Sequence, residues 1–188
     1  MIALHITGDE AADALLSSDP FALLVGMLLD QQVAMETAFA GPEKIRDRLG
    51  RIDPATLARE DADHLADVFK QPPAVHRYPG SMAGRVQALA AAVQDEWGGD
   101  ASAIWTRDEP DGPEVLRRLK ALPGFGDQKA RIFLALLGKR ERFARAGWRE
   151  AAGAYGEDGH RSVADITDPE SLTKVREFKK AQKAAAKA

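Results

Sequence analysis

The chain has 188 residues, no cysteine and a formal net charge of −3. This length predicts one domain or one bilobal unit with a buried core, and the lack of cysteine excludes disulfides, thiolate zinc sites and Cys₄ iron–sulfur clusters. The sequence shows no apolar run near the roughly 18 residues of a membrane span, and its N-terminus lacks a basic flank and a small-residue cleavage site. We therefore expect a cytoplasmic protein with no membrane partner.

Charge is distributed unevenly along the chain. Residues 1–70 carry 13 acidic and 6 basic side chains, whereas residues 71–188 carry 16 acidic and 20 basic ones. Residues 114–149 alone hold 10 basic and 3 acidic side chains. A locally basic face on an acidic protein can hold a nucleic-acid backbone, although solvated helix charge would give the same counts.

Helix-start signals recur in one form. The pairs Asp19-Pro20, Asp53-Pro54 and Asp168-Pro169 each predict an N-cap Asp followed by Pro at the first helical position. With the spacing of apolar residues, they predict helices over 9–17, 20–39, 43–49, 54–69, 82–97 and 100–106, and a last helix from about 169. Gly41-Pro42 is expected to end the second helix, and a proline-rich loop to occupy 70–81. At most residues 2–6 are extended, so the pattern predicts an all-α fold.

Residues 115–138 have the pattern of two helices joined by a very tight glycine turn. Apolar stripes flank the turn: Val115, Leu116 and Leu119 before it, and Ile132, Phe133, Leu136 and Leu137 after it. Pro123 fixes φ, while Gly124 and Gly126 allow positive φ and a close backbone approach. The second helix then begins with free N–H groups at the positive end of its dipole, and this geometry favours an anion such as phosphate.

Three segments of the chain resemble the HhH-GPD superfamily of base-excision DNA glycosylases. LPGFG at 122–126, followed by Lys129-Ala130 and an apolar helix, resembles the helix-hairpin-helix signature of that superfamily. LLDQQVAME at 28–36 is similar to its LxxQ or LQQ segment, most of all in the alkylpurine glycosylases, and MAGRVQALAAAV at 82–93 to the helix before the hairpin. A small bacterial branch without an assigned substrate shares the DQQV, HRYP, LPGFG and GW strings.

The resemblance, which covers residues 20–138, implies a bilobal helical glycosylase-like fold. It would occupy residues 1–178 as one unit, with a Lys/Ala-rich tail at 179–188. The implied partner is double-stranded DNA containing a damaged or mispaired base, bound by a monomer associated with the nucleoid. The resemblance implies no cofactor and no metal.

The turn would hold a DNA phosphate next to the lesion through its backbone N–H groups. The candidate DNA-binding residues there are Leu122, Pro123, Gly124, Phe125, Gly126, Gln128 and Lys129. Gln31 and Gln32, expected in the middle of an apolar helix, would fill the gap left by the target base or form a satisfied surface pair. His76 and Arg77, with Tyr78, could contact phosphate and stack a base, or belong to a rigid surface loop.

The catalytic residues of the superfamily are not at the family spacing. The lysine that forms a Schiff base in bifunctional members would fall at Gln128; Lys129 lies one position later, about 100° round the helix. The carboxylate expected some 20 residues after Gly126 would fall at 146–148, where the chain has none. Asp165, in a segment similar to that of the family, and Asp30 are the replacement candidates. Alternatively, Asp165 caps the final helix and Asp30 is a solvated or paired carboxylate.

We therefore expect a monofunctional DNA N-glycosylase, which breaks an N-glycosyl bond without lyase chemistry. A catalytically inactive protein that binds lesions or DNA structures on the same scaffold is the first alternative, because the family carboxylate is missing. A helical protein-interaction domain is the second, because the N-terminal half is acidic.

Overall fold

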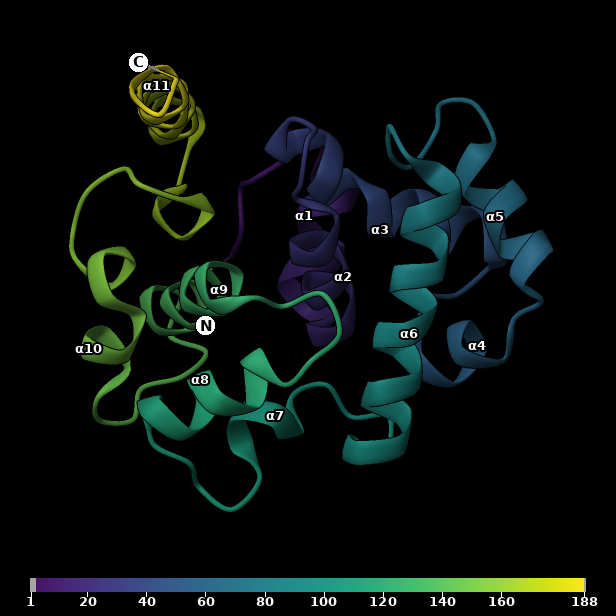
Figure 1. Ribbon diagram of the computed structural model, residues 1–188, viewed down its shortest axis with the longest axis horizontal. Helices are drawn as coiled ribbons and strands as arrows, with labels where there is room; N and C mark the ends of the chain where they lie inside the picture. The colour runs from purple at the N-terminus through teal and green to yellow at the C-terminus, as the bar shows by residue number, and fades with distance from the viewer. Residues whose placement is uncertain (1–2, 188) are drawn as a thin grey trace.

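The computed structural model describes residues 3–187, which fold into helices joined by short turns (Figure 1). The all-α prediction is confirmed for this range. Of the extended stretch expected over 2–6, residue 2 lies outside the described residues and residues 3–6 form no strand. The elements are α1 (Glu10–Ser18), α2 (Pro20–Leu29), α3 (Met35–Leu49), α4 (Pro54–Arg59), α5 (Ala62–Lys70), α6 (Pro79–Trp97), α7 (Ala103–Thr106), α8 (Gly112–Lys120), α9 (Asp127–Lys139), α10 (Trp148–Ala152), the 3-10 turns η1 (Gly153–Gly156) and η2 (Val163–Asp165), and α11 (Pro169–Ala185).

The expected Asp-Pro helix starts are confirmed. The side chain of Asp19 accepts hydrogen bonds from the N–H groups of Phe21 and Ala22, and Pro20 occupies the first turn of α2. Asp53 and Asp168 cap α4 and α11 in the same way. Each carboxylate satisfies N–H groups that the first helical turn leaves free, so these starts depend on local sequence alone.

The predicted helix over 20–39 is wrong, because α2 ends at Leu29. The Gln31 side-chain amide donates to the carbonyl oxygen of Leu28 at 2.9 Å and so satisfies one of the last carbonyls of the helix. Gln32 has a φ of 57°, which a continuing helix does not permit. The chain then turns, and α3 runs through Gly41-Pro42 to Leu49, so the short helix expected at 43–49 is part of α3.

Other helix boundaries also differ from the sequence prediction. Helix α6 begins at Pro79, inside the loop expected over 70–81, and α7 begins at Ala103 and not at residue 100. The helix expected over 54–69 is broken into α4 and α5, because Asp61 accepts from the N–H of His64 and starts a new helix there. The helix expected to dissolve into a lysine-alanine tail near residue 179 continues to Ala185. Its buried residues are Ser171 and Val175, near its start, and the helix lies at the edge of the molecule (Figure 1).

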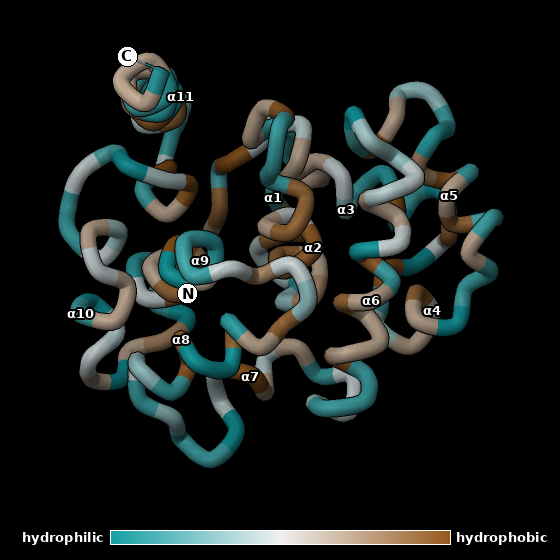
Figure 2. The backbone as a smooth tube through the Cα atoms, viewed as in Figure 1, coloured by the Kyte–Doolittle hydropathy of each residue, from teal (hydrophilic) through white to brown (hydrophobic). Residues whose placement is uncertain are grey.

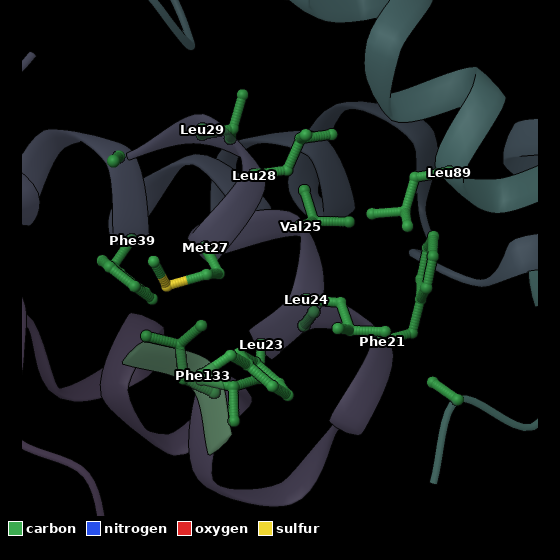
Figure 3. Packing of buried hydrophobic residues seen from close by; sticks show 14 of the residues in the cluster. Phe21, Leu23, Leu24, Val25, Met27, Leu28, Leu29, Phe39, Leu89 and Phe133 are labelled. Atoms are coloured by element: carbon green, nitrogen blue, oxygen red, sulfur yellow. The ribbon is translucent and has the colours of Figure 1, made fainter. Parts of the chain in front are cut away.

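Helix α2 lies at the centre of the molecule, between α3–α6 on one side and α7–α10 on the other (Figure 1). All its residues from Phe21 to Leu29 are buried, which makes it the most hydrophobic segment of the tube in Figure 2. Phe21 and Val25 face Leu89 of α6, and Leu23 lies beside Phe133 of α9 (Figure 3). Burying one such side chain contributes about 1.5–3 kcal/mol, so α2 fixes where the two halves meet.

No single helix in residues 3–187 is both long and apolar enough to cross a membrane. Only α1 and α2 taken together pass that test of length and composition, and they are bent by 117° relative to each other.

Candidate nucleic-acid interface

The glycine turn between α8 and α9 packs directly on the end of α2. The N–H of Phe125 donates to the carbonyl oxygen of Leu122 at 3.1 Å and closes the turn. Gly124 has a φ of +80°, and a Cβ atom there would lie 2.3 Å from Cδ1 of Leu28. Both the backbone angle and the available space therefore require glycine at 124.

We expect Gly124→Ala to destabilise the protein by about 1–3 kcal/mol, because a methyl group at this φ is strained and Leu28, fully buried, has no room to move away. Denaturant unfolding measures the change. Gly126→Ala is the matched control: Gly126 has a φ of −70° and open space around a Cβ atom, so its stability should stay within about 0.5 kcal/mol of the wild type. Equal stabilities for the two variants would contradict this description of the turn.

The apolar side chains of the glycine turn anchor it in the core. Leu122 is 4% exposed and Phe125 2% exposed, and the Phe125 ring meets Phe133 edge-on with centroids 6.1 Å apart. Leu122 and Phe125 therefore offer no side chain to a DNA phosphate, and their N–H groups already donate to the carbonyl oxygens of Leu119 and Leu122, so both residues serve to anchor the turn.

The N-terminus of α9 opens onto solvent. Gly126 is its N-cap and supplies no side-chain cap, and the first helical hydrogen bond runs from the N–H of Ala130 to the Gly126 carbonyl at 3.0 Å. Asp127 lies in this first turn, and hydrogen bonds from Arg131 and Lys120 lower its pKa and offset its charge. The N–H groups of the first turn thus remain oriented toward an incoming anion.

Residues 30–33 form a second turn, held from several sides. The carbonyl oxygen of Gln31 accepts from Nε2 of His76 at 2.9 Å, and its side-chain Oε1 accepts from Arg85 at 3.2 Å. Gln31 is half-buried, whereas Gln32 is exposed at the tip of the turn. The expectation that both glutamines lie inside a helix is wrong. Hydrogen bonds from Arg85 of α6 and from His76 of the proline-rich loop hold Gln31, whereas Gln32 is exposed.

His76 supports this turn and has no ring nitrogen left for DNA. It is 2% exposed, and its Nδ1 accepts from the N–H of Tyr78 at 3.0 Å, so Nε2 carries the hydrogen donated to Gln31. The prediction that His76 contacts DNA through its side chain is corrected to a supporting role. Arg77 is exposed and stacks over the ring of Tyr78, 5.4 Å from its centroid, so this pair stays available for contact.

The turn at 30–33, the start of α9 and α11 enclose a hollow of 220 Å³. Nζ of Lys129 donates to the carbonyl oxygen of Leu28 at 2.9 Å, and Nζ of Lys179 lies 3.4 Å from the carboxylate of Asp30. The residues that line the hollow are Met27, Asp30, Gln31, Gln32, Val33, Gln128, Lys129, Ile132, Lys179 and Lys183. The structure thus brings the expected Asp30, both glutamines, Gln128 and Lys129 to one place.

The pKa of Lys129 is lowered to about 8, chiefly by burial; the charge of Asp30 opposes this shift, and the positive charges of Arg85 and Lys179 add to it. This pKa is below the roughly 10.4 of a lysine in an unfolded chain. Between these two pH values the unfolded state therefore binds more protons than the folded state, and the free energy of unfolding rises with pH. Lys129→Met removes this gain. Chemical unfolding from pH 8 to 10 should therefore show the wild type gaining stability relative to the variant; a flat difference would contradict the shifted pKa.

The structure does not bring Asp165 to the glycine turn. Its carboxylate pairs with Lys139 at 2.5 Å and accepts hydrogen bonds from the N–H groups of Arg161 and Ser162, which completes the capping box of η2, whose N-cap is Ser162. Lys139 is the last residue of α9, and the glycine turn precedes the first, so about 18 Å of helix separates the two ends. The alternative that Asp165 caps the last helix is also wrong, because Asp168 is the N-cap of α11 and Asp165 belongs to the capping box of η2.

Sequence reasoning missed the part that α11 plays at this site. Lys179 pairs with Asp30, and Arg176 pairs with Glu36 of α3, which holds the helix across the hollow. A second hollow of 280 Å³ adjoins the first and lies between the start of α3 and the basic side of α11. The row of lysines from 179 onward was a visible signal, but a frayed tail and a docked helix give the same sequence pattern.

Among residues 3–187, no group of three or more His, Cys, Asp or Glu side chains is arranged to hold a metal ion. Comparison of the chain with protein-family models and with curated proteins gives no match.

Proposed function

We propose that the chain is a monofunctional DNA N-glycosylase with the bilobal helix-hairpin-helix architecture of the HhH-GPD superfamily. The observation that carries this proposal is that the turn at 30–33 and the start of α9, which directly follows the glycine turn, line one hollow. Leu28 lies against Gly124, and Lys129 of α9 reaches the Leu28 carbonyl, so Asp30 and Gln32 lie beside the anion-binding end of α9. A phosphate clamp next to a carboxylate and a free glutamine supplies the parts that base excision needs.

The first step is the fixing of one DNA phosphate. The N–H groups after Gly126 would donate to it, with Lys120 and Arg131 adding positive charge beside Asp127. A fixed backbone allows the neighbouring nucleotide to rotate out of the stack. That rotation costs a few kcal/mol and costs least for a damaged or mispaired base.

Gln32 is the residue suited to occupy the space that the base leaves. It is exposed at the tip of its turn with a φ of 57°, and the backbone beneath it is held by His76. Gln31, by contrast, already uses its amide on Leu28 and Arg85. Of the two glutamines that the sequence offered, the proposal therefore assigns the wedge to Gln32.

Asp30 is the carboxylate that would assist bond breaking. Water adds to C1′ of the sugar as the bond to the base breaks, and the sugar passes through a state with positive charge, which a carboxylate stabilises. The amine of Lys129 is occupied by the Leu28 carbonyl, so we expect no Schiff base and no strand cleavage. This is the chemistry of a monofunctional enzyme.

Single-turnover assays on a panel of damaged duplexes, with an undamaged duplex as control, test the proposal. We expect release of a free base that leaves an intact, alkali-labile strand. Cleavage of the strand without alkali would contradict the monofunctional assignment. Binding of duplexes without release from any member of the panel would instead identify the catalytically inactive lesion-binding alternative.

A further inference from the structure

The hollow beside Asp30 is strongly cationic. Three lysines line it, Lys129, Lys179 and Lys183, against the single carboxylate of Asp30. That carboxylate is already paired with Lys179 at 3.4 Å, and its side chain is only 9% exposed. Arg85 adds a further positive charge close by, on the side-chain oxygen of Gln31. A ligand entering the hollow therefore meets positive charge on several sides.

The walls of the hollow lack the features that favour a cation. Its apolar lining consists of Met27, Val33 and Ile132, and no aromatic ring is among the described residues that line it. Cationic rings are typically held against aromatic faces or unpaired carboxylates, because both offer negative potential. Neither is present here to offset the repulsion from three ammonium groups.

The polar groups of the hollow instead suit a ring rich in carbonyl oxygens. Lysine ammonium groups donate hydrogen bonds and accept none, and Gln32 adds an amide that can both donate and accept. The amide of Gln128 already donates through Nε2 to the hydroxyl of Tyr155 at 2.8 Å. An uncharged base that leaves its sugar acquires negative charge on the ring, and ammonium groups in a partly buried site stabilise charge that develops in this way.

We propose that the hollow selects uncharged, carbonyl-bearing damaged bases, which leave as anions, and excludes cationic alkylated bases. This inference rests on the proposed glycosylase function and names its substrate class. This substrate class differs from the one that the similarity of residues 28–36 to the alkylpurine glycosylases would favour, because the leaving bases of those enzymes include cationic ones. The charge of the hollow depends on α11, which that similarity does not cover.

Binding to cleavage-resistant duplexes tests the selection without requiring activity. Three duplexes of one sequence carry 8-oxoguanine, cationic 7-methylguanine or guanine opposite cytosine, each with a 2′-fluorinated sugar at that nucleotide. We expect the wild type to bind the 8-oxoguanine duplex at least tenfold more tightly than the 7-methylguanine duplex. Lys179→Gln/Lys183→Gln should reduce this ratio at least threefold. Lys174→Gln removes a charge from the same helix outside the hollow, and should leave the ratio unchanged.

The outcomes separate this inference from the proposed function. A preference for 7-methylguanine, equal affinity for the three duplexes, or a ratio that the double variant does not alter would overturn the charge selection. Tighter binding of both lesions than of guanine, with no difference between them, would overturn the selection and leave lesion recognition in place. Failure to bind any of the duplexes would overturn the proposed function and this inference with it.

Discussion

Replacing Asp30 with asparagine should lower the single-turnover rate of base release by about 100-fold or more, with duplex affinity changed by less than about threefold. The amide keeps the shape of the side chain but loses the negative charge that faces the hollow. Removal of one preorganised group that stabilises transition-state charge typically costs 10²–10³ in rate. The measurement is the rate of base release at saturating enzyme on the best substrate of the panel.

Glu36→Gln is the matched control for this variant. Glu36 also pairs with α11, through Arg176, and Asp30 pairs with it through Lys179, so each substitution removes one ion pair between that helix and the body. Glu36 does not line the hollow that contains Lys129. Its variant should keep the rate within about threefold. Equal losses in both variants would show that the position of α11, and not the carboxylate of Asp30, controls the rate.

Gly126→Glu should weaken binding of a duplex at low salt by at least about tenfold without unfolding the protein. The position has an ordinary φ of −70°, and a Cβ atom added there would have no other atom within 4 Å, so glutamate fits. Its carboxylate would occupy the end of α9 where a phosphate is expected, and a tenfold loss corresponds to about 1.4 kcal/mol. Fluorescence anisotropy with a labelled duplex measures the change.

Ala62→Glu controls for the change in net charge. Ala62 is exposed at the start of α5, on the side of the molecule away from α9 (Figure 1). Its variant adds the same carboxylate and should bind duplex like the wild type. Unchanged duplex affinity of a folded Gly126→Glu variant, or an equal loss of affinity in both variants, would contradict the assignment of the turn as a phosphate clamp.

The parts of the fold that depend on local chemistry could be predicted from the sequence. Asp19 and Pro20 start a helix through contacts within one turn, and the spacing of apolar residues after Gly126 indicates a buried helix. The break after Leu29 could not be predicted in the same way. It depends on His76 reaching the Gln31 carbonyl from 45 residues away, and an apolar run before a glutamine pair fits a continuous helix equally well.

The same distinction between local and long-range contacts applies to the site. The glycine turn could be recognised, because proline and glycine impose its geometry where they stand. The grouping of Lys129 with Leu28 spans 101 residues and that of Lys179 with Asp30 spans 149, and no local pattern indicates either contact. Asp165 was a candidate because its segment resembles that of the family, yet Lys139 and the backbone at η2 hold it at the far end of α9.

The most direct test of the central claim is a titration of the amide-labelled protein with a short duplex, followed by two-dimensional NMR. The claim is that the two turns form one DNA interface. It predicts that the amide signals of Gly126, Asp127, Gln128 and Gln32 shift together, with the same dissociation constant. Shifts confined to other elements, with these four signals unmoved at saturation, would contradict it.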